Sequence, residues 1–159
     1  MQRSIRRRRH EAKTDYKARR SLIQSGLPRL VIRKTNRYII AQIVTTNIAQ
    51  DTVVTGTTSK ELLVHGWPEA AQGSLKSLQA AYLTGVLLAK KIKKKISTAI
   101  LDMGMHRNIQ KSRLYALVSG AVEAGLQIPH DASVLPTQEK LEHNTKLQKI
   151  FTDVRKKLT

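Results

Sequence analysis

The chain has 159 residues, enough to bury one core, and no cysteine, which excludes disulfides, thiolate metal sites and cysteine nucleophiles. Its 29 Lys and Arg against 11 Asp and Glu give a formal net charge of +18, which exceeds what solubility requires and predicts a polyanionic partner. No apolar run approaches the roughly 18 residues of a membrane span, and residues 1–10 lack the apolar segment of a signal peptide. We therefore expect a soluble, cytoplasmic protein.

The N-terminal region carries most of the excess charge. Residues 1–37 contain 13 basic and 2 acidic residues, a net of +11, which leaves +7 for the rest of the chain. Residues 6–9 are four consecutive arginines with little apolar content nearby, so we expect an arm over residues 1–13 that stays disordered until it meets phosphates. Guanidinium groups suit this role because their planar donors match phosphate oxygens in pairs. A solvated tail or a nuclear-localisation signal would have a similar composition.

After the arm, the pattern predicts a short helix over residues 14–25, which ends at Gly26 with Pro28 just beyond it. One face of this helix and the residue before it form a basic ridge with one aromatic, made of Lys13, Tyr16, Lys17 and Arg20.

Residues 29–34 and 37–46 are rich in Val, Ile and Thr and predict a β-hairpin that turns at Thr35 and Asn36. A symmetric loop would pair Arg33 with Tyr38. One face would then carry Arg29, Val31, Arg33, Tyr38, Ile40 and Gln42, and the other, which we take as the core face, Leu30, Ile32, Ile39, Ala41 and Ile43. The first face has a composition that can sit on an RNA backbone and stack on a splayed base. A partly exposed sheet face looks similar, and a slip of one residue would exchange the two faces.

Further along, we expect an antiparallel strand over residues 51–57, a helical turn over 59–64 and a loop over 67–73. A helix capped by Ser74 should follow, to about Lys95, with one apolar stripe formed by Leu75, Leu78, Tyr82, Val86 and Ala89. Its end is basic, with Lys90, Lys91, Lys93, Lys94 and Lys95, and lysines there complement the helix dipole and are commonly solvated. A peripheral phosphate contact is the alternative.

The last third predicts a strand over residues 98–101, a helix over 111–124, a loop over 128–136 and an amphipathic helix over 137–158. The helix over 111–124 should bury Leu114, Leu117, Val118, Ala121 and Val122. The final helix docks either on its own domain or on a partner. The succession of elements predicts an α/β fold with a mixed sheet, divided into an arm (1–13), an α/β domain (14–136) and a C-terminal helical extension (137–159).

Nothing in the sequence supports catalysis. The carboxylates lie scattered among different elements, and Asp102, at a strand end, is the most suggestive, although a capping or turn role explains it better. No two histidines are four apart on a helix, so we read His106 and His130 as polar loop residues or RNA contacts and expect no metal. A nucleophile elbow and a phosphate-binding loop are absent as well, so we expect no cofactor and no small-molecule substrate.

Longer strings are more specific than composition. Residues 6–26 (RRRRHEAKTDYKARRSLIQSG) and 28–44 (PRLVIRKTNRYIIAQIV) are followed in order by the blocks HGW (65–67), AYLTG (81–85), LDMG (101–104), EAGLQIPH (123–130) and SVLP (133–136). In these blocks the chain resembles the large-subunit ribosomal protein family numbered eighteen in bacteria and five in eukaryotes, in its archaeal and eukaryotic form.

That resemblance implies a ribonuclease-H-like α/β fold without catalysis, which binds 5S rRNA through the arm, first helix and hairpin. It also implies attachment of the 5S particle to large-subunit rRNA beside neighbouring ribosomal proteins, hence a ribosome-bound chain. Together with the basic ridge and the hairpin face, it predicts RNA contacts at Arg3, Arg6, Arg7, Arg8, Arg9, Lys13, Tyr16, Lys17, Arg19, Arg20, Arg33, Lys34, Asn36, Arg37, Tyr38 and Gln42. The rival hypotheses are a generic basic module for DNA or messenger RNA and a metal-dependent nuclease of the ribonuclease-H type.

Overall fold

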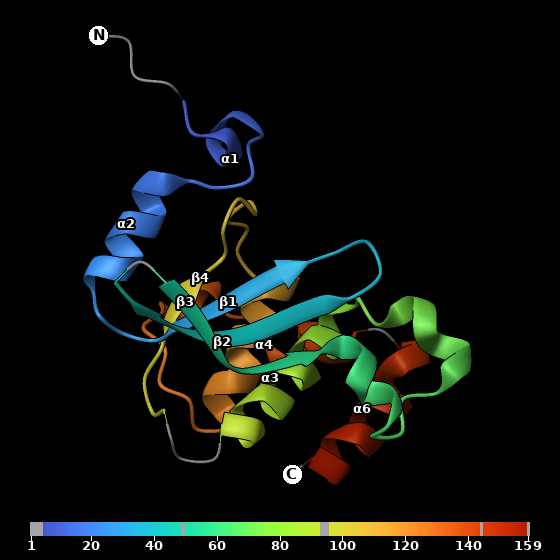
Figure 1. Cartoon of the computed structure of the whole chain (residues 1–159). Coiled ribbons are helices and arrows are strands. Elements are labelled where there is room, and N and C mark those ends of the chain that lie inside the picture. The colour runs from blue at the N-terminus through green and yellow to red at the C-terminus, as the bar shows by residue number, and fades with distance from the viewer. Residues whose placement is uncertain (1–4, 49, 93–95, 144, 159) are drawn as a thin grey trace, which may run out of the picture.

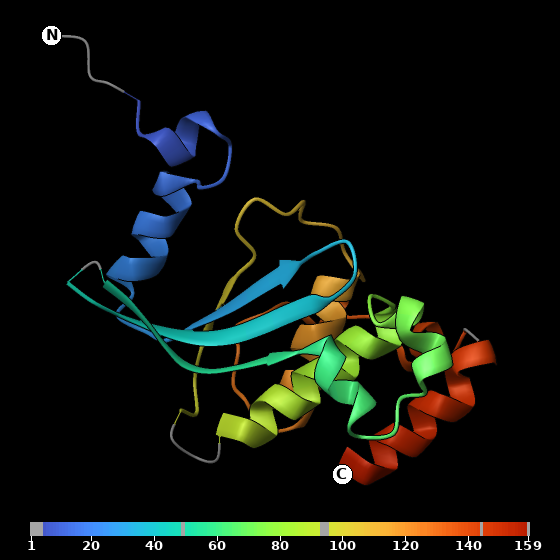
Figure 2. The same ribbon diagram turned by 45° about the vertical axis from the view of Figure 1, so that its right-hand side comes forward.

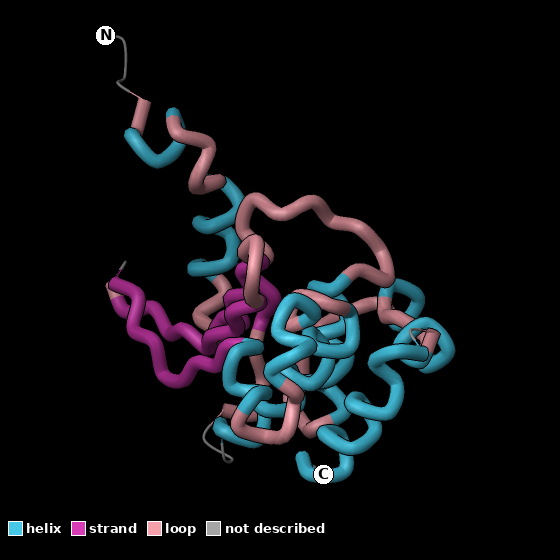
Figure 3. Tube along the Cα trace, turned by 90° about the vertical axis from the view of Figure 1, so that its right-hand side faces the viewer, coloured by secondary structure: helices cyan, strands magenta, loops and turns pink. Residues whose placement is uncertain are grey.

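The computed structural model describes residues 5–48, 50–92, 96–143 and 145–158 (Figure 1). Its sheet has the order β3-β2-β1-β4 and combines β1 (Arg29–Lys34), β2 (Ile39–Asn47), β3 (Gln50–Thr58) and β4 (Ile100–Asp102). The α-helices are α1 (Arg7–His10), α2 (Tyr16–Gln24), α3 (Leu78–Ile92), α4 (Arg113–Glu123), α5 (Gln138–Glu142) and α6 (Thr145–Leu158), and the 3-10 helices are η1 (Ser59–Leu63), η2 (Glu69–Ser74) and η3 (Ala132–Val134). The sheet forms one layer and most of the helices a second (Figure 3).

The sheet is mixed, as predicted. β1 pairs antiparallel with β2 and parallel with β4, and β2 pairs antiparallel with β3. The predicted pairing inside the hairpin is wrong by two residues, because Arg33 pairs with Ile40 and not with Tyr38. Thr35 causes the difference, since its backbone N–H and its hydroxyl both bond to the backbone of Tyr38 and so close a longer turn. A shift of two residues keeps the side chains of β1 and β2 on their predicted faces, while Tyr38 falls in the turn.

The core lies between the sheet and the helices α3 and α4, which both run below it (Figure 2). The predicted core face of the hairpin is confirmed, with Leu30, Ile32, Ile39, Ala41 and Ile43 all buried. α3 is buried on nearly every side from Gln79 to Leu88, not along a single stripe, because the sheet, α4 and α6 surround it. It begins after Ser77, whose hydroxyl accepts the N–H of Ala80, so the predicted cap at Ser74 is wrong.

α3 and α4 cross with their backbones in direct contact. A Cβ added to Gly85 would lie 2.1 Å from the carbonyl oxygen of Leu117, and one added to Gly120 would lie 2.1 Å from that of Tyr82. Only glycine allows this approach, and the contact fixes the position of α4 against α3.

The N-terminal segments stand apart from this core, at the top of Figure 1. The predicted disordered arm contains a turn of helix, α1, after which the backbone N–H groups of Lys13 and Thr14 donate to the carbonyl of Arg8. α2 begins where Asp15 accepts the N–H groups of Lys17 and Ala18, in agreement with the predicted helix. None of the residues of α1 or α2 is buried, so hydrophobic packing does not orient these helices.

The C-terminal helix docks on its own domain, which decides between the two alternatives left open by the sequence. Phe151 on α6 meets the ring of Tyr82 on α3 edge-on, with centroids 5.6 Å apart. The Tyr82 hydroxyl donates to Glu123, which also accepts from Arg155.

Two predicted elements differ in the structure. The predicted single C-terminal helix is divided into α5 and α6, and part of the predicted loop 67–73 forms η2. Among the described residues, no helix has the length and apolar character needed to cross a membrane.

Candidate nucleic-acid interface

A basic cavity of about 1480 Å³ lies between the arm and α2. Six cationic side chains line it, and the acid in its wall is Asp51; these cations are Arg6, Arg8, Arg9, Lys17, Arg19 and Arg20. The guanidinium of Arg6 lies over the ring of Tyr16, 4.7 Å from its centroid, which is a cation–π contact. The arrangement presents several phosphate-binding groups on one concave surface.

Polar contacts within residues 7–14 stabilise the turn of the arm. Arg8 donates through Nε to the hydroxyl of Thr14 at 3.0 Å. Glu11 pairs with Lys13 at 2.8 Å and, more loosely, with Arg7 at 3.9 Å. These pairs are exposed, and exposed ion pairs contribute only about 0 to 1 kcal/mol, so phosphate oxygens can replace them at little cost.

Five side chains form a line of alternating charge across the open face of the sheet, in the order Arg19, Asp51, Arg29, Asp102 and Arg33. Arg19 on α2 pairs with Asp51 at 2.7 Å, and Arg29 pairs with the other oxygen of Asp51, also at 2.7 Å. Arg29 reaches Asp102 at 2.8 Å with its second nitrogen. Arg33 donates to the Asp102 carboxylate at 3.2 Å and to its carbonyl at 3.0 Å. The line joins α2 to three strands.

Asp51 lies at the centre of the contact with α2. Its burial by itself raises its pKa, but hydrogen bonds from Thr46 and Arg29 and the charges of Arg29 and Arg19 outweigh this, and the pKa lies below its usual value. Asp51 is therefore ionised at neutral pH. Because α2 buries no residue, the Arg19–Asp51 pair is a principal constraint on where the basic face of α2 points.

The hairpin loop forms a second basic surface, at the opposite end of β1. Asn36 and Arg37 are exposed at the turn, while Tyr38 is half-buried and packs against the core. These three residues line a shallow cavity of about 290 Å³ together with Gln72, Gly73 and Lys76. Tyr38 therefore lies next to η2 and not beside Arg33, as the predicted strand pairing required.

The structure places the predicted contact residues in three groups. Most of those in the arm and α2 line the large cavity, whereas Arg7 and Lys13 do not, and Arg3 lies outside the described residues. Arg33 and Gln42 lie on the open face of the sheet, where Gln42 pairs with Gly56 of β3. Lys34, Asn36, Arg37 and Tyr38 lie at the hairpin end. In the sequence, α2 is followed directly by β1, but nothing in it indicates how far apart the three groups lie in the fold.

Sequence reasoning missed the residues that orient these groups. Arg29 was placed on the RNA-facing side of the hairpin, yet it is 3% exposed and pairs with two carboxylates. Asp51 carried no signal in the sequence, since its partners lie on other elements. Arg107 and Arg113, which flank a cavity near the end of β1, were also missed, although two cations between a strand and a helix could have drawn attention to that loop.

The arrangement offers little for catalysis. Asp102 is held by Arg29 and Arg33 and accepts the N–H of Gly104, so the turn role favoured for it is accompanied by a buried ion pair. The described residues include no group of three or more His, Asp or Glu that could hold a metal ion.

The basic end of α3 is described only in part. Lys91 pairs with Glu61, while Lys93, Lys94 and Lys95 lie outside the described residues.

The chain is similar to known proteins over most of its length. Residues 1–99 match the family model described as ribosomal large subunit proteins 60S L5 and 50S L18. A protein of Methanoculleus marisnigri named large ribosomal subunit protein uL18 is 46% identical over 137 residues, which cover 86% of this chain and 76% of the relative. The protein of the same name from Korarchaeum cryptofilum is 42% identical over 160 residues, covering 92% and 80%. The chain therefore belongs to the family of ribosomal large-subunit proteins 60S L5 and 50S L18, which are structural proteins of the ribosome and not enzymes.

Proposed function

We propose that this chain is a structural constituent of the large ribosomal subunit that binds 5S rRNA and helps to attach the 5S particle to the large-subunit rRNA. Family membership supports the ribosomal role. The observation that carries RNA binding is the cavity between the arm and α2, where several cations face one concave surface and the carboxylate in the wall is already paired with two arginines.

The proposed contacts divide into two kinds. Arginines of the arm, with Lys13 and Lys17, neutralise phosphates and supply affinity that depends little on RNA sequence. Side chains fixed by the fold supply the shape that selects one RNA: Tyr16 beneath Arg6, Arg19 held by Asp51, and Arg33 held by Asp102. Arg20, Lys34, Asn36, Arg37, Tyr38 and Gln42 complete the proposed surface, and Arg3 is proposed from the sequence alone.

In this proposal the protein is bound to ribosomes in the cytoplasm, and its partners are 5S rRNA, large-subunit rRNA and adjacent ribosomal proteins. Neither a cofactor nor a small-molecule substrate takes part.

The test is a comparison of two RNAs. The purified full chain should bind 5S RNA more tightly than a transfer RNA of matched length at moderate salt, because only the former fits the oriented surface. Since phosphate contacts release counterions, log affinity should fall linearly with log salt, by roughly 0.7 to 0.9 per neutralised phosphate. Equal affinity for both RNAs would leave only a generic basic module.

A further inference from the structure

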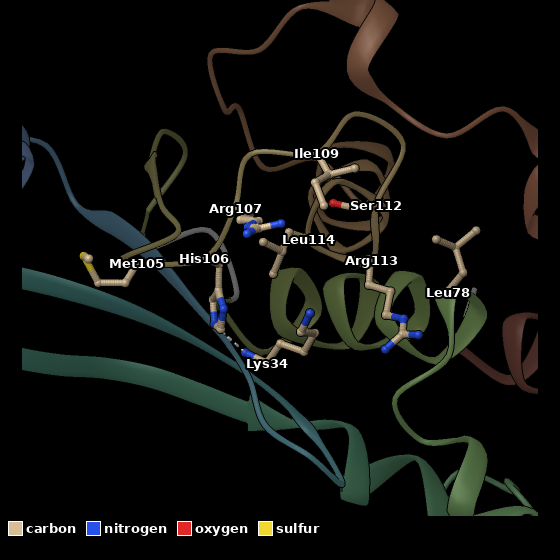
Figure 4. Close-up of a pocket in the computed structure, with 9 residues that line it drawn as sticks. All are labelled: Lys34, Leu78, Met105, His106, Arg107, Ile109, Ser112, Arg113 and Leu114. Carbon is tan, nitrogen blue, oxygen red and sulfur yellow. Dashed lines mark hydrogen bonds between the residues drawn. The ribbon is translucent and has the colours of Figure 1, made fainter. Parts of the chain in front are cut away.

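A third cavity, of about 560 Å³, lies at the far end of β1 from α2, between the loop 103–112 and the beginning of α4 (Figure 4). Since β1 rises about 3.3 Å per residue, it separates this cavity from the end of α2 by roughly 17 Å. We propose that the cavity is an additional RNA-binding site that takes one nucleotide, with its phosphate on Lys34, Arg107 and Arg113 and its base against the apolar wall. This inference rests on the proposed function in one respect, that the partner is RNA.

The charges of the cavity point to an anion. Lys34 enters from β1, Arg107 from the loop and Arg113 from the first turn of α4, and their charged groups lie around the same space (Figure 4). No Asp or Glu is among the residues that line it, and none of the three cations forms an ion pair with a carboxylate in the part of the chain that the structure describes. Elsewhere on the protein, cations such as Arg19, Arg33 and Lys91 are paired.

The start of α4 adds to the positive potential. α4 has 11 residues, and its N-cap residue Ser112 makes no side-chain capping bond. The hydroxyl of Ser112 is buried and has no hydrogen-bond partner among the described residues. The N-terminal end of a helix carries a partial positive charge and unsatisfied N–H groups, both of which favour a phosphate.

The remaining wall is apolar, which distinguishes the cavity from a site for a bare phosphate. Leu78 and Leu114 form part of it, and Ile109 is 58% exposed at the rim. A cavity of this size is in the ordinary range for small ligands, roughly 300 to 1,000 Å³. Apolar side chains beside three cations fit a base and its phosphate.

The loop that forms the cavity is held in place at four points. Gly104 donates its N–H to Asp102 at 2.9 Å, and the backbone N–H of Lys34 donates to His106 Nε2 at 3.0 Å. Tyr115 donates to the side chain of Asn108 at 2.6 Å, and the N–H of Lys111 donates to the carbonyl of Val134 at 2.8 Å. A site ordered before binding loses less entropy when the ligand arrives. The loop also rises on the same side of the sheet as α1 and α2, at the top of Figure 2, so one RNA surface can reach both sites.

The test compares two variants with the same change of charge. Arg107→Gln with Arg113→Gln removes two exposed cations of the cavity, and Lys149→Gln with Lys156→Gln removes two exposed cations from α6 as the control. Measured separately on 5S RNA and on large-subunit rRNA fragments, the cavity variant should bind about tenfold more weakly to at least one RNA, with a salt slope lower by up to about 0.9, the share of one neutralised phosphate. The control should stay within about twofold of the unaltered chain, and Arg107→Lys with Arg113→Lys should restore the salt slope because it keeps both charges.

A further variant tests the apolar wall. Ile109→Ser should weaken binding to the same RNA about threefold without changing the salt slope, since contact with a base releases no counterion. A photo-crosslinking side chain at position 109 should then label RNA in assembled large subunits. A label on protein alone, or a cavity variant that behaves as the control does, would overturn the proposal. These comparisons use one RNA at a time, so they are independent of whether the chain prefers 5S RNA to transfer RNA.

Discussion

Arg29 and Asp102 form an ion pair inside the protein, with Arg29 Nη1 2.8 Å from Asp102 Oδ2 and both side chains almost fully buried. The two residues lie on adjacent parallel strands and are 73 positions apart in the chain. The pair fixes β4 against β1, and through Asp51 it also fixes α2.

Replacing Asp102 should therefore destabilise the fold. Asp102→Ala leaves the buried guanidinium of Arg29 with only Asp51 and Thr46, and removal of one partner of a buried pair costs about 3 to 5 kcal/mol. Urea unfolding followed by circular dichroism measures this free energy. Asp153→Ala, on the exposed side of α6, is the control and should change it much less. A loss below about 1 kcal/mol for Asp102→Ala would contradict a structural role for the pair.

Asp51→Asn should reduce selectivity while keeping affinity. The change releases Arg19 and so loosens α2, and it also removes a negative charge beside the basic cavity. Binding to transfer RNA should be equal or stronger, and the preference for 5S RNA should fall several-fold. Asp153→Asn on the exposed side of α6 makes the same change of charge and should preserve the preference. If the two variants behave alike, Asp51 does not position α2.

Gly120→Ala should destabilise the protein by about 1 to 3 kcal/mol or more, because its methyl group would overlap the carbonyl of Tyr82 and force α3 and α4 apart. Gly73→Ala is the matched control, since an added Cβ meets nothing within 4 Å there. Thermal unfolding of the two variants gives the comparison. Equal midpoints would mean that the two helices can separate without cost.

Deleting residues 1–9 should weaken binding to 5S RNA and to transfer RNA alike and lower the salt slope for both. In the proposed interface these arginines contact phosphates, which all RNAs share, so the preference for 5S RNA should largely remain. Replacing the arginines at 6–9 with lysine keeps the charge and should retain most of the slope. A deletion that abolishes the preference would show that the arm itself reads the RNA.

His106 should make stability depend on pH. Burial and the nearby charges of Lys34 and Arg33 lower its pKa below the usual 6.5. Between that lowered value and about 6.5 the unfolded chain binds a proton at this residue that the folded chain does not, so stability falls as the pH drops through this window. His106→Gln, which keeps an acceptor for the N–H of Lys34, should make unfolding less dependent on pH between 6.5 and 5. An unchanged slope would place the titrating groups elsewhere.

Much of the fold was readable from local patterns. The strands of the hairpin and their buried face were predicted because alternation with a period of two is a property of consecutive residues. The end of the helix after the arm was predicted from Gly26 with Pro28 just beyond it, a signal that operates within a few residues. The hairpin register was wrong by two because it depends on how Thr35 closes the turn with Tyr38, which the strand pattern does not encode.

The sequence by itself determined the polyanionic partner, the family, the order of the elements and the core face of the hairpin, since charge, long strings and periodicity are all written along the chain. The tertiary structure alone decided which arginines are paired and which are free for RNA. Arg29 became a buried structural residue because β4 lies beside β1, and Arg107 and Arg113 came to share a cavity with Lys34 because the start of α4 lies near the end of that strand. Such pairings depend on contacts between residues far apart in sequence, and no local pattern contains them.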